Sequence, residues 1–339
     1  MSLFVEKPGL YTTVQDRGRY GLRRFGYVAG GAMDALSMQA ANILAGNARH
    51  AAVLEWTLQG PRLLLRQDTL AAWCGPELAA YAGGEAVPGW RPVYIRAGTV
   101  LTLGGSMRRG CRGYLAVAGG IDVPLALGSR STYTRAGLGG LEGRPLQAGD
   151  ELQPGRPSPA AERMMAELRL QADAGGSAVL AAAWEASWAV RPGGMQGDSA
   201  VLRVVRGRET ARFKGGLEAL TGHVYRVRPQ SDRMGCRLQG PALELSAPGE
   251  LVSESTAPGT IQVPPDGQPI VLAADSQTTG GYPRIGHVIS ADLPILGQLA
   301  PGAAVRFTEV TLHEAQAELM RQEMNLRLLR TGVRARMGR

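Results

Sequence analysis

Two short segments of the sequence place a carboxylate beside an arginine and a glycine. Residues 15–19 read QDRGR and residues 231–235 read SDRMG. Because a guanidinium group can hold carboxylate or phosphate oxygens through two parallel hydrogen bonds, either segment could bind a small anion or stabilise a developing negative charge. An Asp–Arg pair that fastens its own loop is the alternative for residues 15–19. The candidate site residues here are Gln15, Asp16, Arg19, Asp232 and Arg233.

Hydroxyl groups and further arginines follow glycines in the first half of the sequence. Residues 128–132 read GSRST, a composition suited to a turn whose amides and hydroxyls surround an oxyanion. Gly143 and Gly149 follow closely, next to Arg144 and Asp150. A simple turn is an equally good interpretation of both glycine pairs. The candidates for substrate binding are Arg130, Ser131, Thr132 and Arg144.

The second half contains two polar segments between apolar runs. Residues 262–269 read QVPPDGQP and residues 275–283 read DSQTTGGYP. Loops on rigid β scaffolds commonly carry functional residues, and glycines allow a ligand to approach the backbone. These segments therefore predict a functional loop. Asp275 is a catalytic candidate, and the substrate-binding candidates are Gln262, Gln268, Gln277, Thr278, Gly280, Gly281 and Tyr282.

The candidates share carboxylate, guanidinium, amide and hydroxyl groups, which suit recognition of an amide and transfer of its proton. The sequence has no G-x-x-x-x-G-K-[ST] phosphate loop and no G-x-G-x-x-G dinucleotide fingerprint. Neither Lys7 nor Lys214 is placed for biotin attachment, no serine lies in G-x-S-x-G, and the histidines are isolated from one another. These patterns argue against a P-loop, a covalent carrier, a nucleophile elbow and a metal centre.

Many short strands are expected to position these side chains. The 47 glycines and 21 prolines are spread along the chain. Such a distribution is expected where many short strands are joined by tight turns. Apolar residues at helical spacing predict a helix over residues 33–47 and another over residues 313–330. The sequence therefore indicates a mainly β protein with a few short helices. Short apolar or alternating runs predict strands at residues 62–65, 92–95, 100–103, 113–117 and 201–205.

A length of 339 residues suggests two domains, and a repeat suggests that they are related. The tetrapeptide LQGP at residues 58–61 recurs at residues 238–241, each time before a strand-like run, at residues 62–65 and 242–245. We interpret this as a duplicated β domain, with chance matching as the alternative. The predicted parts are a first β-barrel over residues 1–155, a connection over 156–199, a second barrel over 200–310, and a C-terminal helix with a basic tail over 311–339.

The net charge and the spacing of the cysteines indicate the cellular compartment and the classes of partner to expect. The net charge of +8 arises mainly from dispersed arginines, which indicates a solvated surface, with steering of an anionic substrate as the alternative. No nucleic-acid recognition motif accompanies the charge. Cys74, Cys111 and Cys236 share no CxxC spacing, and no targeting or membrane segment is evident. We expect a cytoplasmic protein with neither nucleic acid nor membrane as a partner.

Several motifs in order resemble one family over about residues 3–310. In the first half they are residues 8–9 (PG), 15–19, 31–34 (GAMD), 41–42 (AN), 128–132 and 143–144. In the second half they are residues 231–235, 259–264 (GTIQVP), 266–269 (DGQP) and 280–283 (GGYP). The sequence resembles the C subunit of bacterial 5-oxoprolinase, a family also described as KipI antagonists and as biotin-dependent carboxyltransferase or allophanate hydrolase subunit 2. The resemblance adds Asp34 to the binding candidates.

The resemblance implies a fold, partners and an activity. It implies two cyclophilin-like β-barrels and an ATP-dependent opening of 5-oxo-L-proline to L-glutamate, carried out with the KipI-like B subunit of 5-oxoprolinase, together with its A subunit. ATP would be held by the complex, since this chain lacks a P-loop. One alternative is a carboxyltransferase acting on urea or a related small amide, with biotin carried on another chain. Another is a non-catalytic regulator that binds a KipI-like kinase inhibitor; prolyl isomerase activity rests on the implied fold alone.

The candidate residues suggest a mechanism for an amide substrate. Arg233 or Arg19 would stabilise the oxyanion that develops on the amide carbonyl. Asp232 or Asp275 would accept or orient the amide proton, with Tyr282 lining the pocket. Alanine at Arg233 and at Asp275 is then expected to remove turnover and to leave the fold and the complex intact.

Overall fold

The computed structural model describes residues 2–76, 78–104, 110–193, 195–196, 199–247 and 251–338. They divide into two compact units. Unit 1 contains Met1–Gly18, Ala35–Arg191 and Glu323–Arg339, and unit 2 contains Arg19–Asp34 and Pro192–Gln322. The segment Arg19–Asp34 therefore belongs to the unit that is built mostly from the second half of the chain.

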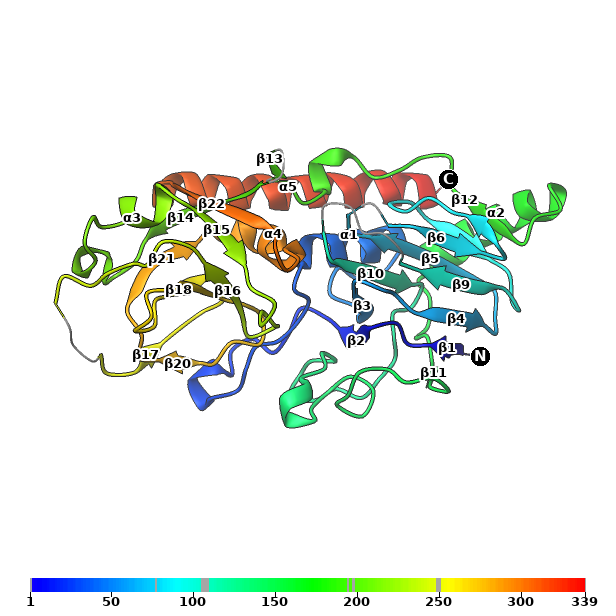
Figure 1. The fold of residues 1–339 in the computed structure, drawn as a ribbon. Helices are drawn as coiled ribbons and strands as arrows, with labels where there is room; N and C mark the ends of the chain where they lie inside the picture. Colours follow the sequence, from blue (N-terminus) through cyan, green and yellow to red (C-terminus); the bar gives the residue numbers. More distant parts are fainter. Residues whose placement is uncertain are drawn as a thin grey trace. The chain divides into compact units, whose positions relative to one another are not determined.

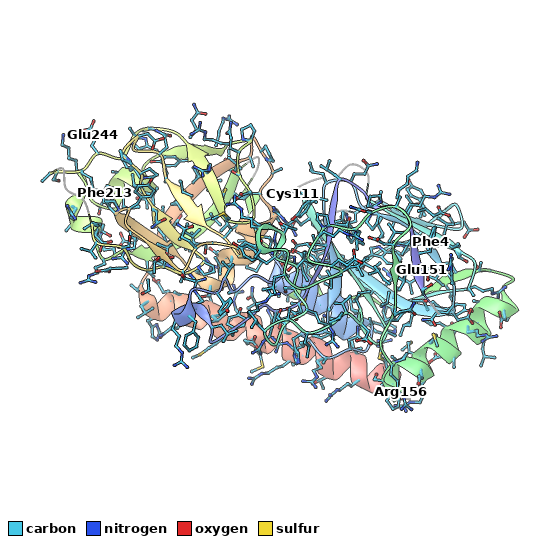
Figure 2. The ribbon with its side chains drawn as sticks, turned by 90° about the horizontal axis from the view of Figure 1, so that it is seen from below. Phe4, Cys111, Glu151, Arg156, Phe213 and Glu244 are labelled. Atoms are coloured by element: carbon cyan, nitrogen blue, oxygen red, sulfur yellow. The ribbon has the colours of Figure 1, made fainter. Side chains whose placement is uncertain are left out.

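Unit 1 is built on two six-stranded sheets, with the strand orders β11-β1-β4-β9-β6-β7 and β12-β8-β5-β10-β3-β2. Phe4 and Glu151, register partners on β1 and β11, lie side by side in Figure 2. The strands are β1 Leu3–Lys7, β2 Tyr11–Gln15, β3 Val53–Thr57, β4 Arg62–Leu65, β5 Thr69–Cys74, β6 Ala80–Ala82, β7 Glu85–Ala86, β8 Val93–Ile95, β9 Val100–Leu103, β10 Arg112–Val117, β11 Glu151–Leu152 and β12 Val179–Ala181.

The two sheets of unit 1 share one apolar core. Successive residues of a strand point to opposite faces, so Leu54 and Trp56 of β3 enter the core with Leu115 of β10, while Glu55 and Tyr114 face the other way. The helix α1 (Ala35–Leu44) packs on β5 and β10. The arrangement is a β-sandwich. The other helices of unit 1 are η2 Thr134–Ala136, α2 Pro159–Ala174 and η3 Trp188–Val190.

Unit 2 is a closed β-barrel. Its sheet has the order β13-β14-β21-β18-β19-β16-β15-β22, and β14 pairs in addition with β22, in parallel, so the ring closes and β13 lies outside it (Figure 1). Closure leaves the barrel strands no unpaired edge. The strands are β13 Met195–Gln196, β14 Ser199–Arg206, β15 Val224–Val227, β16 Gly235–Gln239, β18 Thr260–Gln262, β19 Ile270–Leu272, β21 Arg284–Val288 and β22 Ala304–Glu309.

The barrel interior is apolar and a separate ribbon carries polar residues. Ala200, Leu202 and Val204 alternate along β14 and enter the core with Ile261 and Phe307. Two further strands, β17 (Glu254–Ser255) and β20 (Thr279–Gly280), pair only with each other among the described residues. The helices of unit 2 are η1 Arg23–Phe25, η4 Thr210–Arg212, α3 Glu218–Thr221, η5 Ser290–Asp292 and α4 Leu293–Gln298.

The C-terminal helix α5 (Leu312–Met337) contributes to both units. Its residues up to Gln322 group with unit 2, and those from Glu323 group with unit 1. Within unit 1, Glu323 accepts a hydrogen bond of 2.7 Å from the Arg49 guanidinium. Across the described part of the chain, every helix falls short of the combined length and apolar character needed to cross a bilayer.

The mainly β fold and the second barrel are confirmed, and the details correct three expectations. Unit 1 forms two sheets over one core rather than a closed ring. Residues 242–245 do not form a strand, because only Leu245 makes a bridge, to Phe213. The segment expected to connect the domains contains α2, β12 and η3, and its residues up to Arg191 group with unit 1.

Candidate functional site

The segment Arg19–Asp34 is fastened to the barrel unit by backbone and side-chain hydrogen bonds. Gly30 N donates to Ala274 O at 3.1 Å. Asp34 is fully buried, and its Oδ2 accepts a hydrogen bond of 2.7 Å from Gln298 Nε2. Unit 2 therefore brings sequence-predicted candidates from near the N-terminus, Arg19 and Asp34, into the same folded unit as Arg233 and Asp275.

Arg233 and Asp275 form a buried bidentate ion pair. Arg233 Nε donates to Asp275 Oδ2 at 2.8 Å and Arg233 Nη2 to Asp275 Oδ1 at 3.1 Å, and the two residues are 8% and 5% exposed. Arg233 Nη2 also donates to Gly31 O at 2.6 Å. The two residues are neighbours because the backbone pairing of β16 and β19 continues, with Asp275 N donating to Arg233 O at 2.8 Å. The pair thus holds the loop after β19 to the Arg19–Asp34 segment.

The β17–β20 ribbon is anchored by Arg23, a residue that the sequence did not single out. Arg23 Nη2 donates to Thr256 O at 2.8 Å and to Gln277 O at 2.9 Å. Figure 1 shows the blue turn that contains residues 23–25 beside this ribbon. Thr256 Oγ1 adds a bond of 2.8 Å to Gln277 O. Arg23 therefore holds both strands of the ribbon at one end, next to the loop predicted to be functional.

Three residues that precede or hydrogen-bond to Gln277 carry buried polar atoms without partners. Gln262 is 2% exposed, and its Oε1 accepts a bond of 3.3 Å from Gln277 Nε2. Among the described residues, Gln262 Nε2, Ser276 Oγ and Arg23 Nη1 are buried and have no hydrogen-bond partner. A buried donor without an acceptor costs about 1–3 kcal/mol. Such donors are consistent with a ligand that supplies oxygen atoms.

Gly280 allows the ribbon to lie against Gln262. A Cβ atom at this position would lie 2.4 Å from Gln262 Nε2 and 3.3 Å from Thr256 Cγ2. Any side chain at Gly280 would therefore push the ribbon away from the amide donor. This is a close approach to a neighbouring protein group rather than the approach to a ligand that the sequence suggested for Gly280.

A histidine faces the same side of the barrel as Gln262. On the β18–β21 ladder Thr260 is the partner of His287, and Gln262 is the partner of Arg284. The His287 Nδ1 lies 3.3 Å from Thr260 Oγ1. Burial lowers the pKa of His287 below its ordinary value, because desolvation disfavours the charged imidazolium. Burial therefore favours the neutral form of the His287 imidazole.

Arg284 ties the ribbon to the barrel through two carboxylates. Arg284 donates to both oxygens of Glu209 at 2.7 Å, and its Nη2 also donates to Glu254 Oε2 at 2.7 Å. Glu254 belongs to β17, and Arg208 contacts it at 3.0 Å. The hydrogen bonds from Arg284 lower the pKa values of Glu209 and Glu254, and they raise the pKa of Arg284. The ribbon is thus clamped by two arginines, Arg23 and Arg284.

The Arg284–Glu209 pair predicts a pH dependence of stability. A carboxyl group whose pKa is lower in the folded than in the unfolded protein stabilises the fold above its unfolded pKa, about 4.3, and loses that contribution as the pH falls. We expect Glu209→Gln to be less stable than the wild type at pH 7 and to differ from it less at pH 3. Urea unfolding at both pH values measures this. An equal difference at both would contradict the assignment.

In unit 1, Asp16 is surrounded by donors from its own fold. Its Oδ1 accepts bonds from Gly18 N at 2.7 Å and from the hydroxyls of Ser129 and Ser131, both at 2.6 Å. Its Oδ2 accepts from Arg130 N at 2.7 Å. These contacts join the two polar segments that the sequence singled out, residues 15–19 and 128–132. Asp16 therefore fastens two loops of its own unit through serine hydroxyls and backbone amides.

Ser129 and Ser276 form a matched pair for testing which buried hydroxyl groups stabilise the fold. Both side chains are fully buried, but Ser129 Oγ donates to Asp16 whereas Ser276 Oγ has no partner among the described residues. We expect Ser129→Ala to lower the free energy of unfolding by about 1.5–3 kcal/mol, the usual contribution of a hydrogen bond to a charged group. Ser276→Ala should instead leave the free energy of unfolding unchanged or raise it, by up to about 1–3 kcal/mol, because it removes a buried hydroxyl without a partner. Urea unfolding of both variants measures the contrast, and equal losses would refute it.

The remaining candidates of unit 1 also make internal contacts. Gln15 Nε2 donates to Thr132 O at 3.1 Å, and Thr132 Oγ1 donates to Val14 O at 3.0 Å. Arg130 Nε donates to Val123 O at 2.7 Å. Arg144 grips both oxygens of Asp150 at 2.8 and 2.9 Å, and this hydrogen bonding lowers the pKa of Asp150. These contacts give the residues a role in fastening turns.

The other candidates of unit 2 either hold the backbone by hydrogen bonds or line a groove. Asp232 Oδ1 accepts from Met234 N at 2.8 Å and from Gly235 N at 3.2 Å, which closes a turn. Gln268 exchanges two hydrogen bonds with the backbone of Gly240, at 2.9 and 3.1 Å. Thr278 O accepts from Thr256 N at 2.9 Å. Gly281 and Tyr282 line a groove of about 860 Å³ together with apolar residues, among them Leu243, Leu245, Val263 and Pro283.

Unit 1 contains a buried carboxylate, Glu55, that the sequence did not indicate as a candidate. Glu55 is 2% exposed, and its Oε2 accepts a hydrogen bond of 2.8 Å from the hydroxyl of Tyr114, which is fully buried. Strand register places Thr13, Glu55, Tyr114 and Cys74 in one row across β2, β3, β10 and β5. Only strand alternation could have indicated this polar row, because Glu55 sits in a segment whose neighbours are apolar.

The comparisons with known proteins agree with this architecture. The family model "Carboxyltransferase domain, subdomain A and B" matches residues 25–309. The chain is 38% identical over 319 residues to the C subunit of 5-oxoprolinase from Haemophilus influenzae, covering 94% of each chain. It is 39% identical to the C subunit of 5-oxoprolinase from Escherichia coli, covering 92% of this chain and 93% of the relative.

A solved structure shows the same fold in a much larger protein. The urea amidolyase of K. lactis matches with a TM-score of 0.85 and 28% identity, over 97% of this chain and 20% of that chain. Sequence and structure together therefore show that this chain belongs to the family of the carboxyltransferase domain, subdomain A and B, and that it is similar over nearly its whole length to the C subunits of 5-oxoprolinase.

Proposed function

We propose that this chain is one subunit of a cytoplasmic, ATP-dependent 5-oxoprolinase that converts 5-oxo-L-proline to L-glutamate with two partners, a KipI-like B subunit plus an A subunit. The near full-length similarity to two proteins named as the C subunit of 5-oxoprolinase supports this. The structural observation that carries the proposal is the set of buried donors without partners, Gln262 Nε2, Ser276 Oγ and Arg23 Nη1.

These donors suit the proposed substrate. 5-Oxoproline offers a lactam carbonyl and a carboxylate, and both present oxygens that accept hydrogen bonds. Arg23 supplies a positive charge for the carboxylate, and an amide N–H such as Gln262 Nε2 can hold the lactam oxygen as negative charge develops on it. Urea, by contrast, has no carboxylate to pair with a guanidinium.

The proposed reaction adds water across the lactam C–N bond. The hydroxyl joins the carbonyl carbon, the ring nitrogen receives a proton and becomes the amine of glutamate, and ATP is hydrolysed to ADP and phosphate. His287, whose neutral form is favoured by burial and which lies on the same barrel face as Gln262, is a group of this chain that could accept a proton. We propose ATP binding elsewhere in the complex, because this sequence has no P-loop.

We assign the predicted catalytic residues different roles in this proposal. Arg233 and Asp275 position the loop and its donors through their mutual pair and Gly31 O. Arg19 remains a proposed oxyanion ligand, since it is 2% exposed within the same unit. Asp232 is given no catalytic role, because it is exposed and closes a turn with its carboxylate.

Reconstitution tests the function. This chain and the proposed A and B subunits are purified and combined, and glutamate release from 5-oxoproline is measured with and without ATP. Glutamate that appears only with ATP and all three chains is the expected result. A stable complex that releases no glutamate would reject the proposal and favour a regulator that binds a KipI-like kinase inhibitor.

A carboxyltransferase acting on urea or a related small amide is the second candidate. The match to urea amidolyase, with a TM-score of 0.85 over 97% of this chain, favours it. It would require biotin on another chain, because Lys7 and Lys214 are not in an attachment motif. Carboxylation of urea by this chain, a biotin carboxylase and a biotinylated carrier would establish this activity instead.

A further inference from the structure

The turn of residues 20–27 in unit 2 exposes a concentration of aromatic surface. Tyr20, Phe25 and Tyr27 are 68%, 63% and 46% exposed. Single exposed apolar side chains are common on proteins. Three large ones fall within one short turn, and concentrations of exposed apolar surface commonly mark interaction sites. We call the exposed side chains of residues 20–27 the aromatic turn.

The aromatic turn is held in place by its own backbone and by Arg23. Arg19 N donates to Ala29 O at 2.6 Å, which closes the base of the turn. Gly26, at φ 83°, ends η1 and donates to Arg23 O at 2.9 Å. Arg23 itself is fixed to Thr256 and Gln277. Because the turn is already ordered, a partner would lose little conformational entropy in binding it.

The charge of the segment indicates the chemistry of its partner. Residues 17–33 contain four arginines, at positions 17, 19, 23 and 24, and no aspartate or glutamate. Arg24 is exposed and stacks on Phe25, with its Cζ 4.7 Å from the ring centroid. Tyrosine and arginine are prominent among the residues that dominate interface energies. The complementary surface is an apolar depression bordered by carboxylates.

We infer that the aromatic turn is the docking surface for another protein of the proposed complex, one that presents such an acidic, apolar depression. The inference relies on the proposed function only for the existence of that complex. A second copy of this chain is a poorer occupant, because turn-to-turn contact would oppose like charges at Arg24.

Docking at this turn would also act on the candidate site. Phe25 and Arg23 are residues of the same short helix, η1, and the Arg23 guanidinium holds the backbone of Gln277 in the site ribbon. A partner that fixes Phe25 therefore fixes the residue that orders the ribbon. This makes the turn a means of coupling complex assembly to the site.

Calorimetric titration tests the inference. The proposed A and B subunits are titrated singly and together into wild-type chain and into Phe25→Ser and Tyr27→Ser variants. Leu170→Ser is the matched control, because Leu170 is 72% exposed but lies on α2 in unit 1. We expect each turn variant to bind its partner at least about 30-fold more weakly, as for a residue at the centre of an interface. The control should bind like the wild type.

Other outcomes would overturn the inference. These are unchanged affinity of both turn variants, no binding of either partner by the wild type, or a wild-type homodimer that the variants dissociate. Melting temperatures of the variants equal to that of the wild type show that a loss of binding is not unfolding. If the complex forms at the turn but releases no glutamate, the 5-oxoprolinase proposal fails while the docking surface stands.

Discussion

Replacing Asp275 with asparagine is expected to lower the free energy of unfolding by about 3–5 kcal/mol, the usual effect of leaving one charge of a buried pair without its partner. The Arg233 guanidinium is 8% exposed and would lose the carboxylate that faces it in the folded protein, while its bond to Gly31 O would remain. Urea unfolding at pH 7 measures the loss. A change below about 1 kcal/mol would show that the pair contributes little to the fold.

A double variant separates the structural role of this pair from a catalytic one. Arg233→Met combined with Asp275→Leu removes both charges and keeps apolar volume, so much of the lost stability should return. If turnover of 5-oxoproline stays absent in the stable double variant, the pair positions the substrate or the donors around it. Full turnover in that variant would limit the pair to a structural role.

The sequence alone suggested that alanine at Arg233 or Asp275 would leave the fold intact. The bidentate geometry now gives a physical reason to expect a stability loss in either single variant. Turnover of a single variant is therefore informative only at temperatures where that variant is folded.

Replacing Gln262 with methionine is expected to lower turnover of 5-oxoproline by the reconstituted complex on the order of 100-fold. An amide donor aimed at a developing oxyanion commonly contributes that much. Stability should change by less than about 1 kcal/mol, because removing Nε2, which has no hydrogen-bond partner among the described residues, offsets the loss of the 3.3 Å bond to Gln277. Initial rates and urea unfolding measure the two effects.

Gln268→Met provides the matched comparison. The side chain of Gln268 uses both its oxygen and its nitrogen on the backbone of Gly240. Its replacement should therefore cost about 1–2 kcal/mol of stability and leave turnover nearly unchanged. If both glutamine variants lose turnover equally, or if Gln262→Met keeps wild-type turnover, the donor assignment at Gln262 is wrong.

The local structure of many segments could be predicted from the sequence. The strands β4 (Arg62–Leu65) and β9 (Val100–Leu103) have the predicted bounds, because each is a short apolar or alternating run bounded by glycine or proline. The helix α1 lies within the region predicted from helical spacing, and α5 covers the predicted residues 313–330 and continues to Met337. Residue types in both halves of the chain also suited recognition of an amide.

Other features depend on contacts between residues that are far apart in the sequence. The ribbon β17–β20 escaped prediction because strands of two residues leave no periodic signal. Arg23 reads as a surface arginine until the fold brings it to Thr256 and Gln277. The sandwich of unit 1 and the closed barrel of unit 2 differ through their strand pairing, which local patterns do not encode.

The sequence by itself determined the mainly β character, the positions of many elements and the chemical groups available for a site. Only the tertiary structure decided which polar groups are already satisfied. It turned Asp16 into a fastening for its own loops, joined Arg233 to Asp275, and left Gln262 Nε2 and Ser276 Oγ buried without partners among the described residues. The physical reason is that a hydrogen bond depends on distance and direction between atoms, and both are set only when distant segments pack together.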